Sequence, residues 1–269
     1  MEIVNPIALK LFALILSFVG PAPTDSPKQL QLQAGDKIVS IGDSITFGGG
    51  YLRDIDAVLA QQYPDLKIPQ VINSGKSGHK AEDLIKRFQK DVLDHKPAIV
   101  TINVGINDVW HRLPKSATQP APHDPNVLAR YKENVGKMVD LAQEAGIKVI
   151  LLAPTVIKED PNAEGNQRLP LYVEAMKDIA SQKKCQFVDL HAMFREALKH
   201  KPVNQQGNFL TGDGVHMNDA GNAIMAIGVL RALGVPDEKI AATKPPQPVS
   251  KPTTKTTQPA TAPSSKPAK

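Results

Sequence analysis

The chain has 269 residues, 41% of them hydrophobic, which supports one good-sized core and argues only weakly for two domains. Its formal net charge is +5, but residues 243–269 contain five lysines and no acidic residue. Without these five lysines, 27 of the 32 basic residues remain, and their charge balances that of the 27 acidic residues. The rest of the chain is therefore close to neutral. A body without a basic face or a basic stripe studded with aromatic residues argues against nucleic-acid binding, and we predict no nucleic-acid partner.

An apolar run at residues 11–20 lies near the start of the chain. It is shorter than a comfortable membrane span and has the length of the apolar part of a secretory leader. Small residues at 20–22 are typical of a cleavage site, although Pro23 hinders cleavage there and Glu2 makes the preceding segment poorly basic. We predict that residues 1–26 are a signal peptide and that the protein is exported, either secreted or periplasmic. The alternative is an uncleaved leader that tethers the protein to a membrane.

Strand patterns and helix patterns alternate after this leader. Short β-branched or apolar runs predict buried strands at residues 37–41, 67–73, 98–104, 148–153 and 186–190. Helical periodicity appears at residues 51–63, 80–95, 125–145, 168–183 and 218–233. Parallel strands need crossover connections, so the alternation predicts a parallel sheet with helices on both faces. We assign this α/β domain to residues 27–242.

The single cysteine, Cys185, begins the last predicted strand. One cysteine cannot form an intramolecular disulfide or a cysteine-based metal site. We therefore predict a buried, unreactive thiol.

Residues 243–269 are rich in Pro, Thr, Lys and Ser and have no apolar periodicity. Such a segment cannot repay the entropy cost of its own ordering, so we predict a disordered tail. The tail is a candidate for contact with a cell wall or other polyanions. A solvated extension without a specific role is the simpler alternative.

The first predicted strand stops at Gly42, and Asp43 and Ser44 follow it. Glycines at 48–50 leave room for a ligand near Ser44, whose backbone N–H is well placed to donate to an oxyanion. A serine hydroxyl is a poor nucleophile at neutral pH unless a base lies within hydrogen-bond reach. The alternative is that Asp43 or Ser44 only caps a helix and that the glycines only make a flexible loop.

Asn107 follows the third predicted strand, between Gly105 and Asp108. A neutral amide donor stabilises a developing negative oxygen without competing for the proton. Gly105 permits a tight turn, and Asp108 is a candidate brace for the loop. A loop asparagine that bonds its own backbone is the alternative. Asn73 and Asn103 are poorer candidates, because each lies within or at the end of a predicted strand.

Asp213 and His216 are three residues apart, so one local turn can bring the carboxylate to the imidazole Nδ1. The Nε2 atom then stays free for Ser44, and the carboxylate fixes the imidazole tautomer and stabilises the imidazolium formed on proton transfer.

Asp189 and His191 form a rival pair at the end of the fifth predicted strand. We favour His216 as the base because its loop, residues 207–217, carries glycines and polar residues with little to bury. Asp189 most simply caps the helix that begins near His191.

These polar segments, and Gly78 after the second strand, each lie beyond the end of a predicted strand. In an open parallel sheet, ligands bind in the crevice beyond the carboxyl ends of the strands. Groups that are far apart in sequence therefore converge there. Together they supply the nucleophile, base, orienting acceptor and oxyanion donors that serine ester hydrolysis needs.

The sequence resembles the SGNH (GDSL-type) hydrolase family in four segments: Ile41-Gly42-Asp43-Ser44-Ile45-Thr46, Asn73-Ser74-Gly75-Lys76-Ser77-Gly78, Gly105-Ile106-Asn107-Asp108 and Asp213-Gly214-Val215-His216. The resemblance extends over residues 37–233. Each segment alone is a weak signal, whereas all four in this order and spacing are a specific one.

The resemblance implies an acyl-enzyme mechanism in which Ser44 is the nucleophile, His216 the base and Asp213 its partner. It implies a flavodoxin-like three-layer α/β/α sandwich with a five-stranded parallel sheet, commonly in the order 2-1-3-4-5. It implies neither a metal ion nor an organic cofactor.

The resemblance also implies an oxyanion hole made by the backbone N–H groups of Ser44 and Gly78 and the side chain of Asn107. Gly75 competes with Gly78 for this role. We favour Gly78 because the functional glycine of the family lies some residues after the asparagine.

The substrate is less constrained, because reactions of the family include carbohydrate deacetylation, lysophospholipid hydrolysis and thioester hydrolysis. Residues 109–124 form a long loop directly after Asn107, and Trp110 in it is a candidate for stacking on a sugar ring or for sealing the loop onto the body. A polar loop at 154–168 is expected to border the cleft as well. Asp43 and Val215 are further candidate substrate contacts.

No amphipathic lid is evident, which argues against long-chain lipid substrates. We predict a short-chain acetylesterase that acts on carbohydrate esters, with a small-molecule or oligosaccharide ester as its partner. One alternative is a lysophospholipase or thioesterase-like acylhydrolase. The other is a non-catalytic, surface carbohydrate-binding protein.

Overall fold

The computed structural model describes residues 16–17, 30–111, 113 and 124–244. Most of the predicted leader, most of the loop at 109–124 and the predicted tail from residue 245 onward lie outside these residues. In the part of the chain that is described, no helix combines the length and the apolar character needed to cross a bilayer.

Five parallel strands form one sheet in the order β2-β1-β3-β4-β5. The strands are β1 (Ile38–Gly42), β2 (Ile72–Gly75), β3 (Ile99–Asn103), β4 (Lys148–Leu152) and β5 (Gln186–Val188). All residues of β1 and β3 are buried, as expected for parallel strands that are covered on both faces. The predicted fold class and strand order are confirmed.

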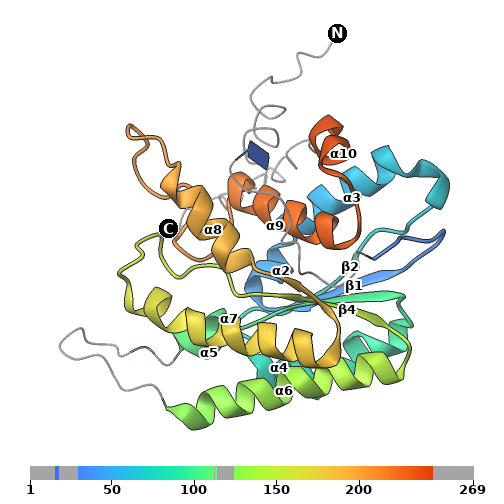
Figure 1. The fold of residues 1–269 in the computed structure, drawn as a ribbon, viewed down its shortest axis with the longest axis horizontal. Coiled ribbons are helices and arrows are strands. Elements are labelled where there is room, and N and C mark those ends of the chain that lie inside the picture. The colour runs from blue at the N-terminus through green and yellow to red at the C-terminus, as the bar shows by residue number, and fades with distance from the viewer. Residues whose placement is uncertain (1–15, 18–29, 112, 114–123, 245–269) are drawn as a thin grey trace, which may run out of the picture.

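Helices cover both faces of this sheet (Figure 1). One layer contains α4 (Ala81–Asp91), α5 (Ile106–Trp110), α6 (Pro125–Glu144) and α7 (Glu164–Lys183). The other contains α3 (Gly50–Gln62), α8 (Leu190–Lys199), α9 (Asp219–Ala232) and α10 (Asp237–Ala242). The short helix α2 (Ser44–Gly48) packs at the ends of β1 and β2, and two 3-10 turns, η1 (Pro64–Leu66) and η2 (Leu93–His95), complete the described elements.

The helices bury the faces that their sequences make apolar. In α6 the buried side chains recur every three or four residues, and Tyr131 from this face meets Tyr172 of α7 edge to face, with ring centroids 4.8 Å apart. Helix α9 is apolar nearly all round, and it is accordingly buried between the sheet and the neighbouring helices α3 and α8. Cys185 is buried as predicted, and burial raises the pKa of its thiol to about 11.

Several element boundaries differ from the sequence-based prediction, since α4 ends at Asp91 instead of residue 95 and β5 ends at Val188 instead of residue 190. The second strand does not span 67–73 but starts at Ile72, where it pairs with β1. Lys67 has a left-handed conformation with φ of 48°, and Pro69 has no N–H to donate, so this part of the chain cannot join the sheet. Helix α7 begins at Glu164 instead of residue 168, since its polar first turn shows no apolar periodicity.

The strand order places the site. From β1 the chain moves outward to β2 and then returns to β3 on the opposite side of β1. The crevice beyond the carboxyl ends of β1 and β3 is therefore the point where the winding of the sheet reverses, and open α/β sheets bind ligands at such a point. Ser44 follows β1 there, and Asn107 follows β3.

Candidate active site

Ser44 is the first residue of α2, directly beyond the end of β1. The preceding Asp43 caps this helix, since its Oδ1 accepts the N–H of Ile45 at 2.9 Å. Asp43 therefore does cap a helix, whereas the alternative that this triplet serves only for capping stays untested. The cap holds Ser44 at the carboxyl edge of the sheet.

The Asp43 side chain is completely buried, and this burial raises its pKa to about 6. Its Oδ2 lies 3.4 Å from Nδ2 of Asn107. An enclosed carboxylate cannot touch a bound ligand, so this position gives no support to the prediction that Asp43 contacts the substrate. The side chain joins the Ser44 turn to Asn107.

A continuous series of hydrogen bonds connects Asp213, His216 and Ser44. The distance from Asp213 Oδ2 to His216 Nδ1 is 2.6 Å, and that from His216 Nε2 to Ser44 Oγ is 2.9 Å. Asp213 Oδ1 also accepts the backbone N–H groups of Val215 and His216. Burial acts to raise the pKa of Asp213, but these hydrogen bonds outweigh it and lower the pKa to about 2. The carboxylate therefore stays ionised and orients the imidazole toward the serine hydroxyl.

The rival pair at the end of β5 has a different arrangement. Asp189 caps α8 by accepting the N–H of Ala192, as predicted. The imidazole of His191 is buried, with its Nδ1 atom 2.6 Å from the carbonyl oxygen of Thr155. Burial lowers the pKa of His191. This histidine belongs to the core and not to the crevice.

The loop that carries Asp213 and His216 is fastened by the neighbouring segment. The Glu159 carboxylate accepts the three backbone N–H groups of residues 209–211 and the hydroxyl of Thr211, at 2.5 to 2.8 Å. The N–H of Lys158 also donates to the carbonyl oxygen of Gly214 at 2.6 Å. The polar loop that we expected to border the cleft therefore supports the Asp213–His216 loop instead.

Gly78 lies in the turn between β2 and α4, with a φ of 79° that suits glycine. Among the described residues, no acceptor takes the backbone N–H of Gly78 or of Ser44, so both remain available. The N–H of Gly75, in contrast, donates to Oδ1 of Asn73 at 2.9 Å within β2. This difference agrees with the preference for Gly78 over Gly75.

Asn107 is buried between the two segments that carry these N–H groups. Its Nδ2 donates to the carbonyl oxygen of His79, next to Gly78, at 3.1 Å, and it faces Asp43, next to Ser44. Of the two poorer candidates, Asn103 lies in β3 and points its amide at the carbonyl oxygen of Leu152, and Asn73 lies in β2 and donates to the carbonyl oxygen of Phe47. The fold thus places the Asn107 amide beside the residues that adjoin the other two predicted donors.

Asp108 braces the Asn107 loop, as the sequence suggested. Both of its carboxylate oxygens lie 3.3 Å from the N–H of Ala81, the first residue of α4. Burial, reinforced by the nearby Asp43, raises the pKa of Asp108 to about 7. The carboxyl group ties α5 to α4 behind the donors.

A cleft of about 440 Å³ opens beside Ser44 and His216. Its other lining residues come from α2, α3, the 76–80 turn and the start of α9: Ile45, Phe47, Gly48, Gly50, Arg53, Ser77, Met217, Asp219 and Asn222. Phe47 is 64% exposed, which is unusual for an aromatic side chain and marks a contact surface. No group of three or more His, Cys, Asp or Glu side chains in the described ranges is arranged to hold a metal ion.

Two predicted substrate contacts do not line this cleft. Trp110 ends α5 and is 39% exposed, while the side chain of Val215 packs against the core. Phe47 and Arg53 line the cleft but are not among the contacts predicted from the sequence. Phe47 carries one signal that points to it, because it follows Ser44 by three residues and one helical turn places it beside the serine. Arg53 has no such signal.

The GDSL-like Lipase/Acylhydrolase family profile matches residues 40–224. The chain belongs to this family. It is 31% identical over 221 residues to an acetylxylan esterase of Geobacillus stearothermophilus, a match that covers 76% of this chain and 97% of the relative. The predicted family and the predicted carboxylic ester hydrolase activity are confirmed.

A second relative is an uncharacterized lipoprotein, YqeF, of Bacillus subtilis, 27% identical over 72% of this chain and 88% of the relative. Among solved structures, Axe2, an acetylxylan esterase from Geobacillus stearothermophilus, matches with a TM-score of 0.67 and 30% identity over 77% of this chain and 98% of that protein. Three further Axe2 structures are described as catalytic mutants, in which a serine, an aspartate and a histidine are each replaced by alanine.

Proposed function

We propose that this GDSL-family ester hydrolase cleaves acetyl and other short-chain esters of carbohydrates through a covalent acyl-enzyme. The observation that carries the proposal is the hydrogen-bond series from Asp213 through His216 to Ser44 at the mouth of the cleft. The catalytic aspartate and histidine of Axe2 are also three positions apart, the spacing of Asp213 and His216.

In the first half-reaction, Ser44 Oγ attacks the ester carbonyl carbon while His216 Nε2 takes the hydroxyl proton. Asp213 stabilises the imidazolium that forms. The carbonyl oxygen becomes an oxyanion and accepts hydrogen bonds from the backbone N–H groups of Ser44 and Gly78 and from Asn107 Nδ2, whose second N–H turns from Asp43 Oδ2 to the oxyanion. The imidazolium then protonates the leaving alcohol oxygen, the carbon–oxygen bond breaks, and the acyl group stays on Ser44.

In the second half-reaction, water gives a proton to His216 Nε2 and attacks the acyl carbon. The same donors stabilise the second oxyanion. Collapse of this intermediate breaks the bond to Ser44 Oγ, which takes the proton back from His216. The carboxylic acid leaves, and the starting state is restored.

The cleft supports a sugar as the alcohol part of the ester. Phe47 offers an exposed ring on which an apolar sugar face can stack, and Arg53, Asp219 and Asn222 offer hydrogen-bonding groups beside it. Among the described lining residues, large apolar side chains are limited to Ile45, Phe47 and Met217, which favours a short acyl group. The similarity to an acetylxylan esterase points to the same substrate class.

The roles of the two histidines can be tested with three alanine variants. Ser44→Ala and His216→Ala should each lower kcat for 4-nitrophenyl acetate by about 10³-fold or more, because either change removes proton transfer between hydroxyl and imidazole. His191→Ala is the matched control and should lower the thermal unfolding midpoint while kcat changes little. Full turnover by Ser44→Ala, or a larger kcat loss in His191→Ala than in His216→Ala, would contradict the assignment.

The substrate class can be tested by measuring acid release from acetylated xylo-oligosaccharides, mono-acetylated sugars, acetylated pectin fragments, an octanoate ester and a lysophospholipid, with Ser44→Ala as the blank. Acetylated sugars should give the highest kcat/KM. Phe47→Ala should raise KM for the acetylated oligosaccharide and leave KM for 4-nitrophenyl acetate nearly unchanged. Faster release of octanoate than of acetate would favour a lipase-like function instead.

We also propose that the protein works outside the cytoplasm. The apolar run at residues 11–20 and the similarity to a lipoprotein support export. An uncleaved leader would tether the enzyme to a membrane. The lysine-rich tail would attract the enzyme to a cell wall or to other polyanions. Acetylated polysaccharides occur there together with negatively charged groups.

A further inference from the structure

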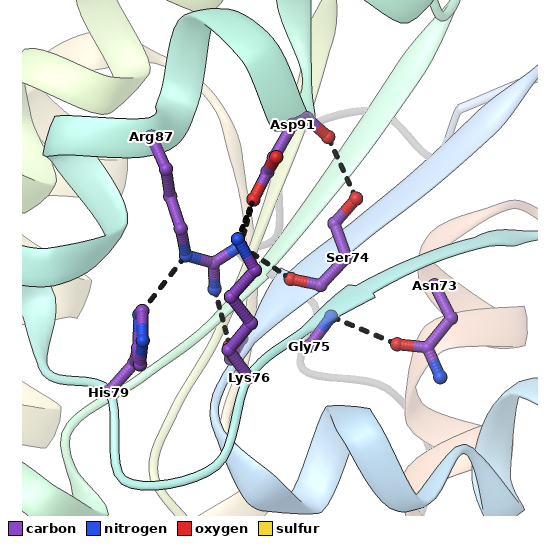
Figure 2. Close-up of polar contacts among 8 residues, drawn as sticks. Asn73, Ser74, Gly75, Lys76, His79, Arg87 and Asp91 are labelled. Carbon is purple, nitrogen blue, oxygen red and sulfur yellow. Dashed lines mark hydrogen bonds and ion pairs between the residues drawn. The ribbon is translucent and has the colours of Figure 1, made fainter.

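Arg87 of α4 is the centre of a polar cluster that includes Ser74, His79 and Asp91 (Figure 2). Only 9% of its side chain is exposed. Nη2 donates to the carbonyl oxygen of Gly42 at 2.8 Å, and Nη1 donates to the carbonyl oxygen of Ser74 and to Asp91 Oδ2, both at 2.7 Å. Nε donates to Nδ1 of His79 at 3.2 Å. One guanidinium therefore joins the ends of β1 and β2 to the turn that carries Gly78.

The charge of this buried guanidinium is balanced within the cluster. Asp91 lies one turn further along α4 and also pairs with Lys76 at 3.1 Å. Burial acts to raise the pKa of Asp91, but the hydrogen bonds from Arg87 and Lys76 outweigh it and lower the pKa. The hydroxyl of Ser74 donates to the backbone carbonyl of Asp91, which closes the cluster. A paired and fully hydrogen-bonded ion is the form in which a buried charge is tolerated.

Each oxyanion donor lies close to a partner of Arg87. Gly42 precedes Ser44 by two residues, and His79 follows Gly78 directly. The carbonyl oxygen of His79 is also the acceptor of Asn107 Nδ2 at 3.1 Å. We propose that Arg87 is a positioning residue that keeps the three oxyanion donors in the relative positions that the transition state requires.

Lysine cannot replace arginine in this role. The guanidinium directs donors along three fixed directions in one plane, toward Gly42, Ser74 and His79, whereas an ammonium is a point charge on a flexible stem. Oxyanion stabilisation depends on donors that are already in place before the charge develops, so small displacements are costly. The effect is expected in kcat, since the cluster lies behind the donors and outside the cleft that binds the substrate.

The inference rests on the proposed function, and Arg87→Lys tests it. For 4-nitrophenyl acetate, we expect kcat to fall by about 10- to 100-fold, while KM stays within about threefold of the wild type. Arg231→Lys is the matched control, because Arg231 is comparably buried, with 11% exposed, and pairs with Asp237 between α9 and α10. This control should lose thermal stability to a similar extent but keep kcat within about twofold.

His79→Leu is the second variant, in case Arg87→Lys does not fold. It removes the Nδ1 acceptor of a half-buried side chain and retains the backbone carbonyl that holds Asn107. We expect kcat to fall by about 10-fold at unchanged KM. Wild-type kcat in Arg87→Lys, or in His79→Leu, would overturn the inference, as would an equal kcat loss in Arg231→Lys. If Ser44→Ala retains wild-type turnover, the proposed function itself fails, and this result is distinct from the others.

Discussion

At the scale of single residues, two buried acids lie behind the oxyanion donors. Asp43 caps the helix that begins with Ser44, and Asp108 accepts the first N–H of α4. Both give up hydration to hold backbone N–H groups, and burial raises their pKa values to about 6 and about 7. The site therefore contains carboxyl groups whose ionisation is costly at neutral pH.

This cost predicts how Asp108 affects stability as the pH changes. The folded pKa of about 7 lies above the ordinary value of 3.8, so the folded state binds this proton more tightly than the unfolded state. The contribution of Asp108 to the free energy of unfolding is therefore fully present below about pH 4 and is lost as the pH rises to about 7.

The amide of Asp108→Asn cannot ionise, so this variant should not lose unfolding free energy through position 108 as the pH rises. The free energy of unfolding, measured with urea, should fall between about pH 5 and about pH 8 in the wild type. In Asp108→Asn, this fall should be smaller by more than about 1 kcal/mol. Asp124→Asn, at the exposed cap of α6, is the control and should follow the wild-type pH profile. Parallel profiles for the wild type and Asp108→Asn would contradict the prediction.

At the scale of elements, the Asp213–His216 loop owes its shape to a segment outside the cleft. The loop contains few apolar residues, and its backbone N–H groups at 209–211 need acceptors. Glu159 supplies them with one carboxylate. Hydrogen bonds to a charged acceptor are stronger than those to a neutral one, so this contact should decide how well the loop is ordered.

Glu159→Gln should therefore weaken catalysis without changing a residue of the cleft. The amide keeps one acceptor oxygen but turns an N–H₂ group toward backbone donors. We expect kcat/KM for 4-nitrophenyl acetate to fall by about 10-fold or more, and proteolysis within residues 207–217 to become faster. Glu174→Gln, on the exposed face of α7, should change neither quantity. Equal effects of the two substitutions would argue against this role of Glu159.

At the scale of the whole molecule, the order of the strands explains why distant segments meet. With β1 between β2 and β3, the turns after all three strands lie at one edge of the sheet. Helix α9 then places the loop that precedes it against α2. Ser44 and His216, 172 residues apart in the chain, come to lie 2.9 Å apart in this way.

The proposed export of this enzyme can be examined by expressing the full chain in a bacterium and measuring intact masses in the medium, envelope and cytoplasm. A cleaved leader predicts a mass that lacks the first 20 or so residues, in the medium or periplasm. A tethered enzyme predicts the full mass in the envelope fraction. Full-length enzyme found only in the cytoplasm would refute export.

The sequence alone was enough to predict the class of the sheet and the positions of most of its elements. Strand runs such as 98–104 and helix runs such as 125–145 have periodicities that are set locally, and the structure follows both. The second strand was placed too early, because its partner decides where it begins. Ile72–Gly75 enters the sheet through its pairing with β1, which no local pattern encodes.

In the candidate site, too, some features follow from the local sequence and others from the fold. The pairing of Asp213 with His216 and the capping by Asp189 could be predicted from local spacing, because three residues let side chain and backbone meet in one turn. Three other features depend on the folded arrangement: Glu159 holds the His216 loop, Phe47 and not Trp110 lines the cleft, and Arg87 links β1, β2 and the Gly78 turn. These contacts join segments from separate elements, and their partners are chosen by strand order and packing instead of by neighbours along the chain.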